Sequence, residues 1–160
     1  MSTLYIMCGI PGSGKTYFAN HYLPAKVVVS RDKIRYSMIQ DNENYFDHEP
    51  EVFKQFASVL AQHLQHFDSV AADATHLNIW SRKKLTNAID RMYSDYRIVY
   101  VVCDPSLPVC LYRNSKRKGR ERVPDSIVRD MATKFAPPNE NYKLEDRRAV
   151  GVWHITGEPA

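Results

Sequence analysis

Residues 9–16 read Gly-Ile-Pro-Gly-Ser-Gly-Lys-Thr, and this stretch decides the fold of the chain. It fits the pattern Gly-x-x-x-x-Gly-Lys-Ser/Thr of a phosphate-binding P-loop at every fixed position. An apolar run, residues 4–8, precedes the loop, and a helix-compatible stretch, residues 15–19, follows it. This strand–loop–helix context distinguishes a working P-loop from a glycine-rich turn that merely precedes a helix.

The residue types of the loop suit the phosphates of a nucleoside triphosphate. Three glycines let the backbone turn its N–H groups inward, and the start of the following helix adds positive potential. We expect Lys15 to reach the β- and γ-phosphates and the Thr16 hydroxyl to bind Mg²⁺. The expected nucleotide-binding residues of the loop are Gly9, Gly12, Ser13, Gly14, Lys15 and Thr16, with ATP and Mg²⁺ as the ligands.

Apolar stretches and stretches of helical period alternate along the chain, which favours a three-layer α/β P-loop fold with a mostly parallel sheet flanked by helices. The predicted strands are 4–8, 27–29, 69–73, 96–103 and 150–155. The predicted helices are 15–19, 31–40, 50–67, 80–92, one that begins at Pro105 with Asp104 as its cap, and 127–135. Residues 41–49 are polar and predict a loop. With no internal repeat, we expect a single domain over residues 1–160.

The composition is that of an ordinary soluble domain. Hydrophobic residues make up 44% and charged residues 25% of the 160 residues. The sequence has no apolar run near the roughly 18 residues of a membrane span and no charged-then-apolar leader, so we expect no membrane partner. The three cysteines form no Cys-x-x-Cys pair, which favours a reducing cytoplasmic compartment over a disulfide or zinc framework.

Positive charge is concentrated late in the chain. The formal net charge is +4, and residues 113–148 hold eleven Lys and Arg against six Asp and Glu, whereas the rest of the chain holds eleven against twelve. Six of these basic residues lie within residues 113–122. Such a run is commonly a solvated loop. Beside a triphosphate site it also suits a polyphosphate or a nucleic acid.

Residues 30–35, Ser-Arg-Asp-Lys-Ile-Arg, directly follow the second predicted strand, where the ligand crevice of a parallel sheet lies. Asp32 and Arg35 are three residues apart and share a face of the first helical turn. A carboxylate there can accept a proton from an attacking hydroxyl, and an arginine can grip a phosphate with two hydrogen bonds. The same spacing also fits a plain surface ion pair, and spacing alone leaves both readings open.

Two further segments carry candidate chemistry. Asp73 ends a buried strand, and an acid at this place resembles the Walker B carboxylate of P-loop proteins, which orients Mg²⁺ or its waters. The alternative is that Asp73 only caps a helix or lies in a loop. The lid segment, residues 113–124, is basic, contains Gly119, and is predicted to close over the triphosphate. One of its arginines, Arg113 or Arg117, could then stabilise charge on the transferring phosphoryl group.

Taken together, these blocks resemble the bacteriophage-type 5′-hydroxyl polynucleotide kinases, within the wider group of small P-loop kinases. Residues 30–35 look like the family's Asn-Arg-Asp-x-x-Arg block. Residues 73–78, Asp-Ala-Thr-His-Leu-Asn, are similar to its Asp-Ala-Thr-Asn-Leu-Asn block, and residues 113–117, Arg-Asn-Ser-Lys-Arg, resemble its lid. The resemblance covers residues 3 to about 136.

The resemblance implies a role for each matching residue. Asp32 would be the general base that deprotonates the 5′-hydroxyl, and Arg35 would hold a phosphate of the acceptor strand. Lys15 and Thr16 would contact the donor phosphates and Mg²⁺, and the lid arginines Arg117 and Arg113 would contact the donor phosphates. Asp73, with Thr75, would support Mg²⁺ or the acceptor site. The implied catalytic residues are thus Asp32, Lys15 and Arg117.

The sequence departs from the family in two ways. His76 stands where the family has Asn, and the phosphatase motif Asp-x-Asp-Gly-Thr of the phage enzyme is absent. We therefore expect transfer from ATP to 5′-hydroxyl ends of DNA or RNA without 3′-phosphatase activity, in the cytoplasm, or the host cytoplasm if the chain is phage-encoded. The alternatives are a kinase of a nucleoside, a sugar or an amino-sugar nucleotide, and a nucleotide-binding adaptor that hydrolyses ATP slowly. The oligomeric state and the choice between DNA and RNA stay open.

Overall fold

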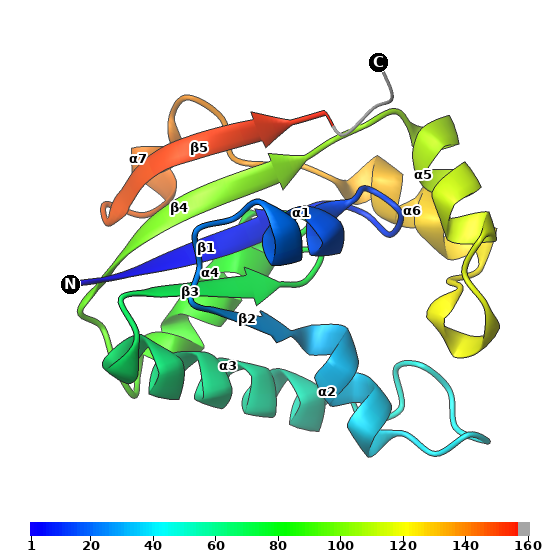
Figure 1. Ribbon diagram of the computed structural model, residues 1–160, viewed down its shortest axis with the longest axis horizontal. Helices are drawn as coiled ribbons and strands as arrows, with labels where there is room; N and C mark the ends of the chain where they lie inside the picture. The colour runs from blue at the N-terminus through cyan, green and yellow to red at the C-terminus, as the bar shows by residue number, and fades with distance from the viewer. Residues whose placement is uncertain (157–160) are drawn as a thin grey trace.

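A five-stranded sheet forms the middle layer of the computed structural model, which describes residues 1–156 (Figure 1). Its strands are β1 Ser2–Cys8, β2 Val27–Ser30, β3 Ser69–Asp73, β4 Tyr96–Cys103 and β5 Ala149–Ile155. They lie in the order β2-β3-β1-β4-β5, and every neighbouring pair is parallel. The predicted strands and the predicted parallel sheet are therefore confirmed.

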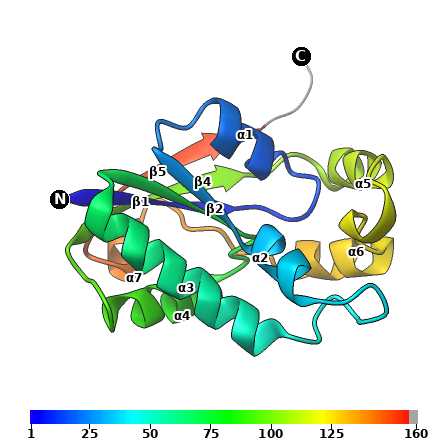
Figure 2. The same ribbon diagram turned by 60° about the horizontal axis from the view of Figure 1, so that its bottom comes forward.

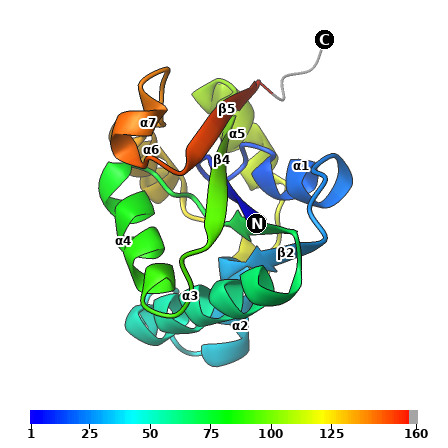
Figure 3. The same ribbon diagram turned by 90° about the vertical axis from the view of Figure 1, so that its left-hand side faces the viewer.

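Helices cover both faces of this sheet, as the end-on view in Figure 3 shows. On one face lies α1 (Lys15–His21), and on the other lie α3 (Glu49–His66) and α4 (Ile79–Asp90). The remaining helices are α2 Arg31–Met38, α5 Leu107–Ser115, α6 Asp125–Lys134 and α7 Tyr142–Glu145, with a 3-10 turn η1 at Gly119–Glu121. The predicted three-layer α/β architecture is confirmed. Within residues 1–156, no helix has both the length and the apolar character that a bilayer crossing requires.

The central strand β1 contributes side chains to two separate hydrophobic cores. Leu4 and Ile6 pack in the core that includes Phe56 of α3, and Met7 packs in the core that includes Ala19 of α1. Full burial of each large apolar side chain stabilises the fold by about 1.5–3 kcal/mol. Because both faces of a parallel strand are buried, such a strand is a continuous apolar run in the sequence.

Side-chain caps set where two of the helices begin, α2 and α4. Ser30 accepts a hydrogen bond from the Lys33 backbone N–H at 3.2 Å, at the start of α2. Asn78 and Ser81 form a reciprocal capping box at the start of α4. These bonds satisfy N–H groups that have no partner inside the helix.

The predicted helix start at Pro105, with Asp104 as its cap, is wrong. α5 begins at Leu107, and Ser106 takes the cap position. The backbone N–H of Asp104 donates instead to the Ile155 carbonyl oxygen at 3.1 Å, so Asp104 still extends the pairing of β4 with β5. Predicted helix ends at 40 and 92 also lie two residues beyond those of α2 and α4.

Two short elements, η1 and α7, are additions to the predicted set. A helix of three or four residues is too short to show a hydrophobic period, so the sequence pattern does not reveal it. α7 is positioned by the buried carboxylate of Glu145, which accepts hydrogen bonds from the buried Arg82 guanidinium at 2.8–3.2 Å.

The carboxyl ends of the strands, together with α2, α5 and α6, gather at one end of the molecule, which Figures 1 and 2 show from two directions. From β1 the chain passes to the edge strand β2, returns to β3, and then crosses to β4 on the other side of β1. In a parallel sheet such a reversal opens a crevice at the carboxyl ends. The P-loop and the segments that follow β2 and β3 all end there.

Candidate active site

The P-loop turns sharply between β1 and α1, and its glycines are required by the geometry. Gly12 has a φ of 83°, in the left-handed region, and a Cβ atom on it would lie 2.2 Å from the Cys110 carbonyl oxygen. A Cβ atom on Gly9 would lie 2.4 Å from the Ser13 hydroxyl oxygen. Gly9 also donates its N–H to the Thr75 carbonyl oxygen at 3.0 Å, which ties the loop to the segment after β3.

Polar groups without protein partners line the inner side of the loop. Gly14 caps α1 in the left-handed region, with a φ of 88°. Lys15 is only 8% exposed, and the buried Ser13 hydroxyl has no hydrogen-bond partner within the described residues. Because such buried groups are costly to leave unsatisfied, the loop is built to receive an anion.

Thr16 and Asp73 meet at the floor of the crevice. The Thr16 hydroxyl donates to Asp73 Oδ2 at 2.8 Å, while Asp73 Oδ1 is buried without a partner among residues 1–156. A hydroxyl and a carboxylate oxygen are hard ligands of the kind that Mg²⁺ prefers, usually completed by substrate phosphates and water. The pair therefore fits the predicted Mg²⁺ site, although no cluster of three His, Cys, Asp or Glu side chains suited to a metal occurs in the described residues.

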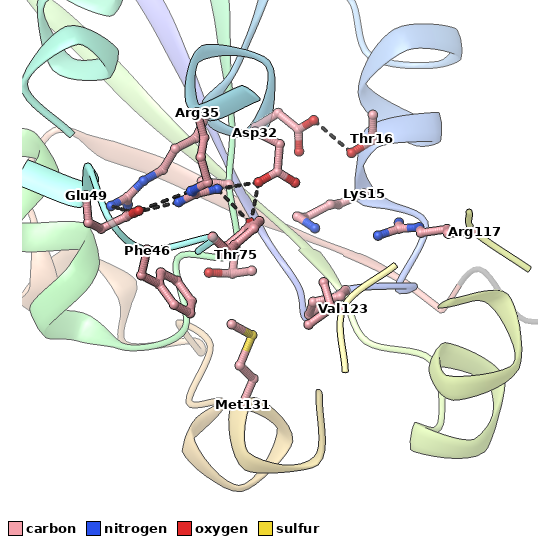
Figure 4. A pocket seen from close by; sticks show the side chains of 15 residues that line it. Lys15, Thr16, Asp32, Arg35, Phe46, Glu49, Thr75, Arg117, Val123 and Met131 are labelled. Carbon is pink, nitrogen blue, oxygen red and sulfur yellow. Dashed lines mark hydrogen bonds and ion pairs between the residues drawn. The ribbon is translucent and has the colours of Figure 1, made fainter. Parts of the chain in front are cut away.

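Asp32 lies on the first turn of α2, opposite the P-loop, with its side chain 50% exposed. Its Oδ1 atom accepts hydrogen bonds from Arg35 Nη1 and, at 2.5 Å, from the Tyr45 hydroxyl. Figure 4 shows the second carboxylate oxygen directed towards Lys15. The predicted Asp32–Arg35 ion pair is thus present, and it belongs to the crevice rather than to an open surface.

Arg35 is buried and already holds several protein partners. Its Nε and Nη2 atoms donate to the two carboxylate oxygens of Glu49 at 3.1 and 2.5 Å, and Nη1 donates to Tyr45 and Asp32. Four of its five N–H groups are used in this way, which leaves one for a substrate phosphate. Burial alone would lower the pKa of Arg35, but its bonds to Glu49 and the charges around it outweigh burial and raise that pKa.

Glu49 anchors this cluster from the start of α3. Burial alone would raise its pKa, yet the hydrogen bonds and charges of Arg35 and Arg31 hold the pKa of Glu49 below its usual value. Arg31 contributes a hydrogen bond of 2.7 Å to Glu49 Oε1. Glu49 is therefore a carboxylate that fixes two arginines on the α2 side of the cleft.

One cleft of about 310 Å³ brings most of the predicted site residues together (Figure 4). Polar groups from the P-loop, α2 and β3 line one side. Phe46, Val123 and Met131 supply an apolar side. The predicted site residues that line it are Lys15, Thr16, Asp32, Arg35, Asp73, Thr75 and Arg117.

The other predicted residues line neighbouring hollows. Arg113 and Arg117 share a cavity of about 370 Å³ with Gly12 and Gly14. Arg113 also lines a larger, mostly aromatic and aliphatic cavity of about 650 Å³ on the α1 side, together with Ser13. Arg113 at the end of α5 and Arg117, which lies beyond that helix, thus both border the P-loop.

Asn114 closes the base of the lid segment. Its buried side chain donates to the Val123 carbonyl oxygen at 2.6 Å and accepts from the Val123 N–H at 3.1 Å. These two bonds join the end of α5 to the segment just before α6 and close the basic stretch between them into a loop. Of the basic residues in this loop, Arg117 lines the cleft.

Tyr45, Phe46 and Glu49 are among the cleft residues that sequence reasoning missed. Tyr45 and Phe46 lie in the polar stretch 41–49, which predicted only a loop. Glu49 ends that stretch and is explained from the sequence as an acid that suits the positive N-terminal end of the next helix. Two adjacent aromatic residues inside an otherwise polar segment were the available signal. Exposed loop residues of this kind are disproportionately functional.

His76, which stands at the departure from the family pattern, does not lie in the cleft. It is 4% exposed, with a φ of 43°. Its Nδ1 lies 2.5 Å from the Met7 carbonyl oxygen, and its ring stacks with Phe56. Its place is structural, at the junction of β1 and α3.

Comparison with protein families identifies the AAA domain family AAA_33, whose model matches residues 4–138. No curated protein matches the chain. Among solved structures, a chain of the Pnkp1/Rnl/Hen1 RNA repair complex is 24% identical with a TM-score of 0.69. The match covers 90% of the present chain but only 45% of that chain, so the present chain spans less than half of its length.

Other similar structures are matched along most of their length. A sugar kinase from Janibacter sp. HTCC2649 is 16% identical with a TM-score of 0.64, over 99% of this chain and 87% of that one. Kti12 from Chaetomium thermophilum, in complex with ADP-AlF3, is 14% identical with a TM-score of 0.67, over 98% and 90%. At these identities the likeness establishes the shared P-loop kinase fold.

Proposed function

The chain belongs to the AAA domain family, and from this premise we propose that it is an ATP- and Mg²⁺-dependent 5′-hydroxyl polynucleotide kinase. The observation that carries the proposal is the cleft itself. It holds Lys15 and Thr16 of the P-loop at one side and the carboxylate of Asp32 at the other. A donor phosphate and an acceptor hydroxyl would meet between them.

On the donor side, the P-loop would bind the phosphates of ATP. The buried Ser13 hydroxyl, which has no hydrogen-bond partner within residues 1–156, and the Lys15 ammonium would donate to the phosphates, and Thr16 with Asp73 would hold Mg²⁺. Bound there, the metal would neutralise charge on the phosphates. Arg117 lines the same cleft and would stabilise the negative charge that builds up on the transferring phosphoryl group.

On the acceptor side, Asp32 would act as the general base. Its outward carboxylate oxygen would take the proton of the acceptor hydroxyl while the acceptor oxygen forms a bond to the γ-phosphorus. At the same time the bond between the γ-phosphorus and the oxygen that bridges the β- and γ-phosphates would break. The products are a 5′-phosphate and ADP. The remaining N–H of Arg35 and the hydroxyl of Thr75 would contact the acceptor.

Three observations support a nucleic acid as the acceptor. Arg117 of the lid segment lines the cleft, and the region 113–148 carries five more positive than negative charges. Phe46, Val123 and Met131 form an apolar side of the cleft that also holds Asp32, and this side suits a base or a sugar of the acceptor. Pnkp1, whose complex is named for RNA repair, has the same fold.

A kinase of a small molecule is the second candidate. The cleft of about 310 Å³ is at the lower end of the range for small-ligand sites. The sugar kinase from Janibacter is matched over 87% of its length. With such an acceptor, Asp32 would keep the same role.

Transfer of labelled γ-phosphate from ATP and Mg²⁺ to short 5′-hydroxyl oligonucleotides, DNA and RNA in parallel, tests the proposal. We expect label at the 5′ end with the wild-type protein and its loss with Asp32→Asn. Strong salt dependence of acceptor binding would accompany a nucleic acid, because several phosphate contacts weaken together. Nucleotide binding without transfer to any oligonucleotide would reject the polynucleotide proposal and favour a small acceptor.

A further inference from the structure

We propose that Tyr45 is a positioning residue that holds Asp32 with one carboxylate oxygen turned to the acceptor hydroxyl. This inference rests on the proposed phosphoryl transfer, in which Asp32 is the base. Tyr45 comes from the loop between α2 and α3, thirteen residues after Asp32, and reaches the carboxylate across the acceptor side of the cleft.

The two oxygens of the Asp32 carboxylate are in different situations. Oδ1 accepts both hydrogen bonds that the described residues donate to this side chain, one from the Tyr45 hydroxyl and one from Arg35 Nη1. The other oxygen faces the open cleft, towards Lys15 (Figure 4). An incoming hydroxyl would therefore meet a single, prepared lone-pair acceptor.

Tyr45 is itself held firmly. The guanidinium of Arg35 stacks over its ring, 4.1 Å from the centroid, and donates to its hydroxyl oxygen at 2.6 Å. Phe46 packs edge-on against the ring at 4.7 Å. The hydroxyl thus accepts from Arg35 and donates to Asp32, which fixes the direction of its single proton.

Tyr45 also keeps that proton under all ordinary conditions. Burial, and next the negative charge of Asp32, raise the pKa of Tyr45 well above its usual value. The phenol therefore remains a donor wherever Asp32 is a carboxylate. Because donor and acceptor capacity are both used inside the protein, Tyr45 has no hydroxyl function left for substrate.

The need for such a residue follows from the exposure of Asp32. The carboxylate of a half-exposed aspartate on a first helical turn is free to rotate, and proton transfer needs an orientation that directs one oxygen at the acceptor hydroxyl. Holding a reacting group in its productive geometry supports the rate of the chemical step, with little effect on substrate binding. Arg35 Nη1 and the Tyr45 hydroxyl donate to the same oxygen, Oδ1, and the two bonds together fix the direction of the carboxylate.

Steady-state kinetics of Tyr45→Phe test this role, because that change removes only the hydroxyl. With whichever acceptor the wild-type protein phosphorylates, we expect kcat to fall about 10- to 100-fold while the KM values for ATP and acceptor and the melting temperature stay near wild type. Tyr112→Phe, which removes a hydroxyl from an exposed tyrosine of α5, is the matched control and should change nothing. A raised acceptor KM with unchanged kcat, or no change at all, would overturn the inference.

Proton NMR of the free protein separates this inference from the proposed reaction. The hydrogen bond from Tyr45 to Asp32 should give a downfield hydroxyl resonance that Tyr45→Phe removes, that Asp32→Asn moves upfield because a neutral amide oxygen is a weaker acceptor, and that Tyr112→Phe keeps. If the wild-type protein phosphorylates no acceptor yet shows this resonance, the proposed function fails and the contact stands. Absence of the resonance, or its survival in Tyr45→Phe, would reject the positioning role.

Discussion

His76 is a buried histidine whose charge state follows from its surroundings. Burial lowers the pKa of His76 to about 3, although its hydrogen bond to the Met7 carbonyl oxygen acts in the opposite direction. The ring is therefore neutral, with the Nδ1 proton donated to Met7. Its φ of 43° is a conformation that Asn adopts more readily than most residues, so an Asn at this position would suit the same backbone.

We expect His76 to make the fold sensitive to acid. The unfolded chain takes up a proton here near pH 6.5 and the folded chain only near pH 3. Stability is therefore complete above about pH 6.5 and is lost as the pH falls towards 3, by up to about 1.4 kcal/mol per pH unit. Urea unfolding at about pH 7.5 and about pH 5 should show a smaller loss for His76→Asn than for wild type. Equal losses in the two proteins would contradict this assignment.

Among the elements, the lid segment is docked on α2 through one residue. Arg120 stacks over the Tyr36 ring at 4.9 Å from the centroid and donates to the carbonyl oxygens of Tyr36 and Ile39 at 3.3 and 3.5 Å. The Tyr36 hydroxyl returns a hydrogen bond of 3.1 Å to the Arg120 carbonyl oxygen. The helix that carries Asp32 and the segment that carries Arg117 are thereby joined across the cleft.

Arg120→Ala should loosen the lid segment. Loss of a partly exposed cation–π contact of about 1 kcal/mol would raise amide hydrogen exchange in residues 115–122 about fivefold. Exchange measured by mass spectrometry checks this. Arg122→Ala is the matched control, because its half-exposed ion pair with Asp125, at 4.0 Å, contributes little. Equal exchange in the two variants would argue against docking through Arg120.

Across the whole molecule, Arg82 of α4 connects parts that are distant in sequence. Its buried guanidinium pairs with Glu145 of α7 and donates to the carbonyl oxygens of His76, at 3.0 Å, and Ala136, at 3.1 Å. One side chain therefore ties the segment after β3 to the chain beyond α6. We expect such cross-links to make residues 1–160 unfold as a single domain in one transition.

Arg82→Ala should lower the free energy of unfolding by about 3–5 kcal/mol, because it leaves the Glu145 carboxylate buried and unpaired. Denaturant unfolding followed by circular dichroism measures the change. Arg91→Ala, which removes an exposed arginine next to the end of the same helix, should cost less than about 0.5 kcal/mol. A loss of similar size in both variants would mean that the buried pair is not the cause.

Much of this molecule could be predicted because its signals are local. The strands are continuous apolar runs, since both faces of a parallel sheet are buried, and the P-loop pattern specifies its own backbone turn. Asp32 and Arg35 share a helical turn, so their contact follows from spacing alone. The start of α5 was misplaced because the backbone N–H of Asp104 pairs with the Ile155 carbonyl oxygen of another strand, a contact that local propensity does not show.

By itself the sequence therefore determined the order of strands and helices, the phosphate loop and the pairing on α2. Only the tertiary structure decided which groups surround the base. Tyr45 and Glu49 lie thirteen and seventeen residues from Asp32, in and after a loop with no period, and they reach the cluster because that loop folds back over α2. Contacts made by such a return depend on the path of the whole chain, and no residue spacing encodes them.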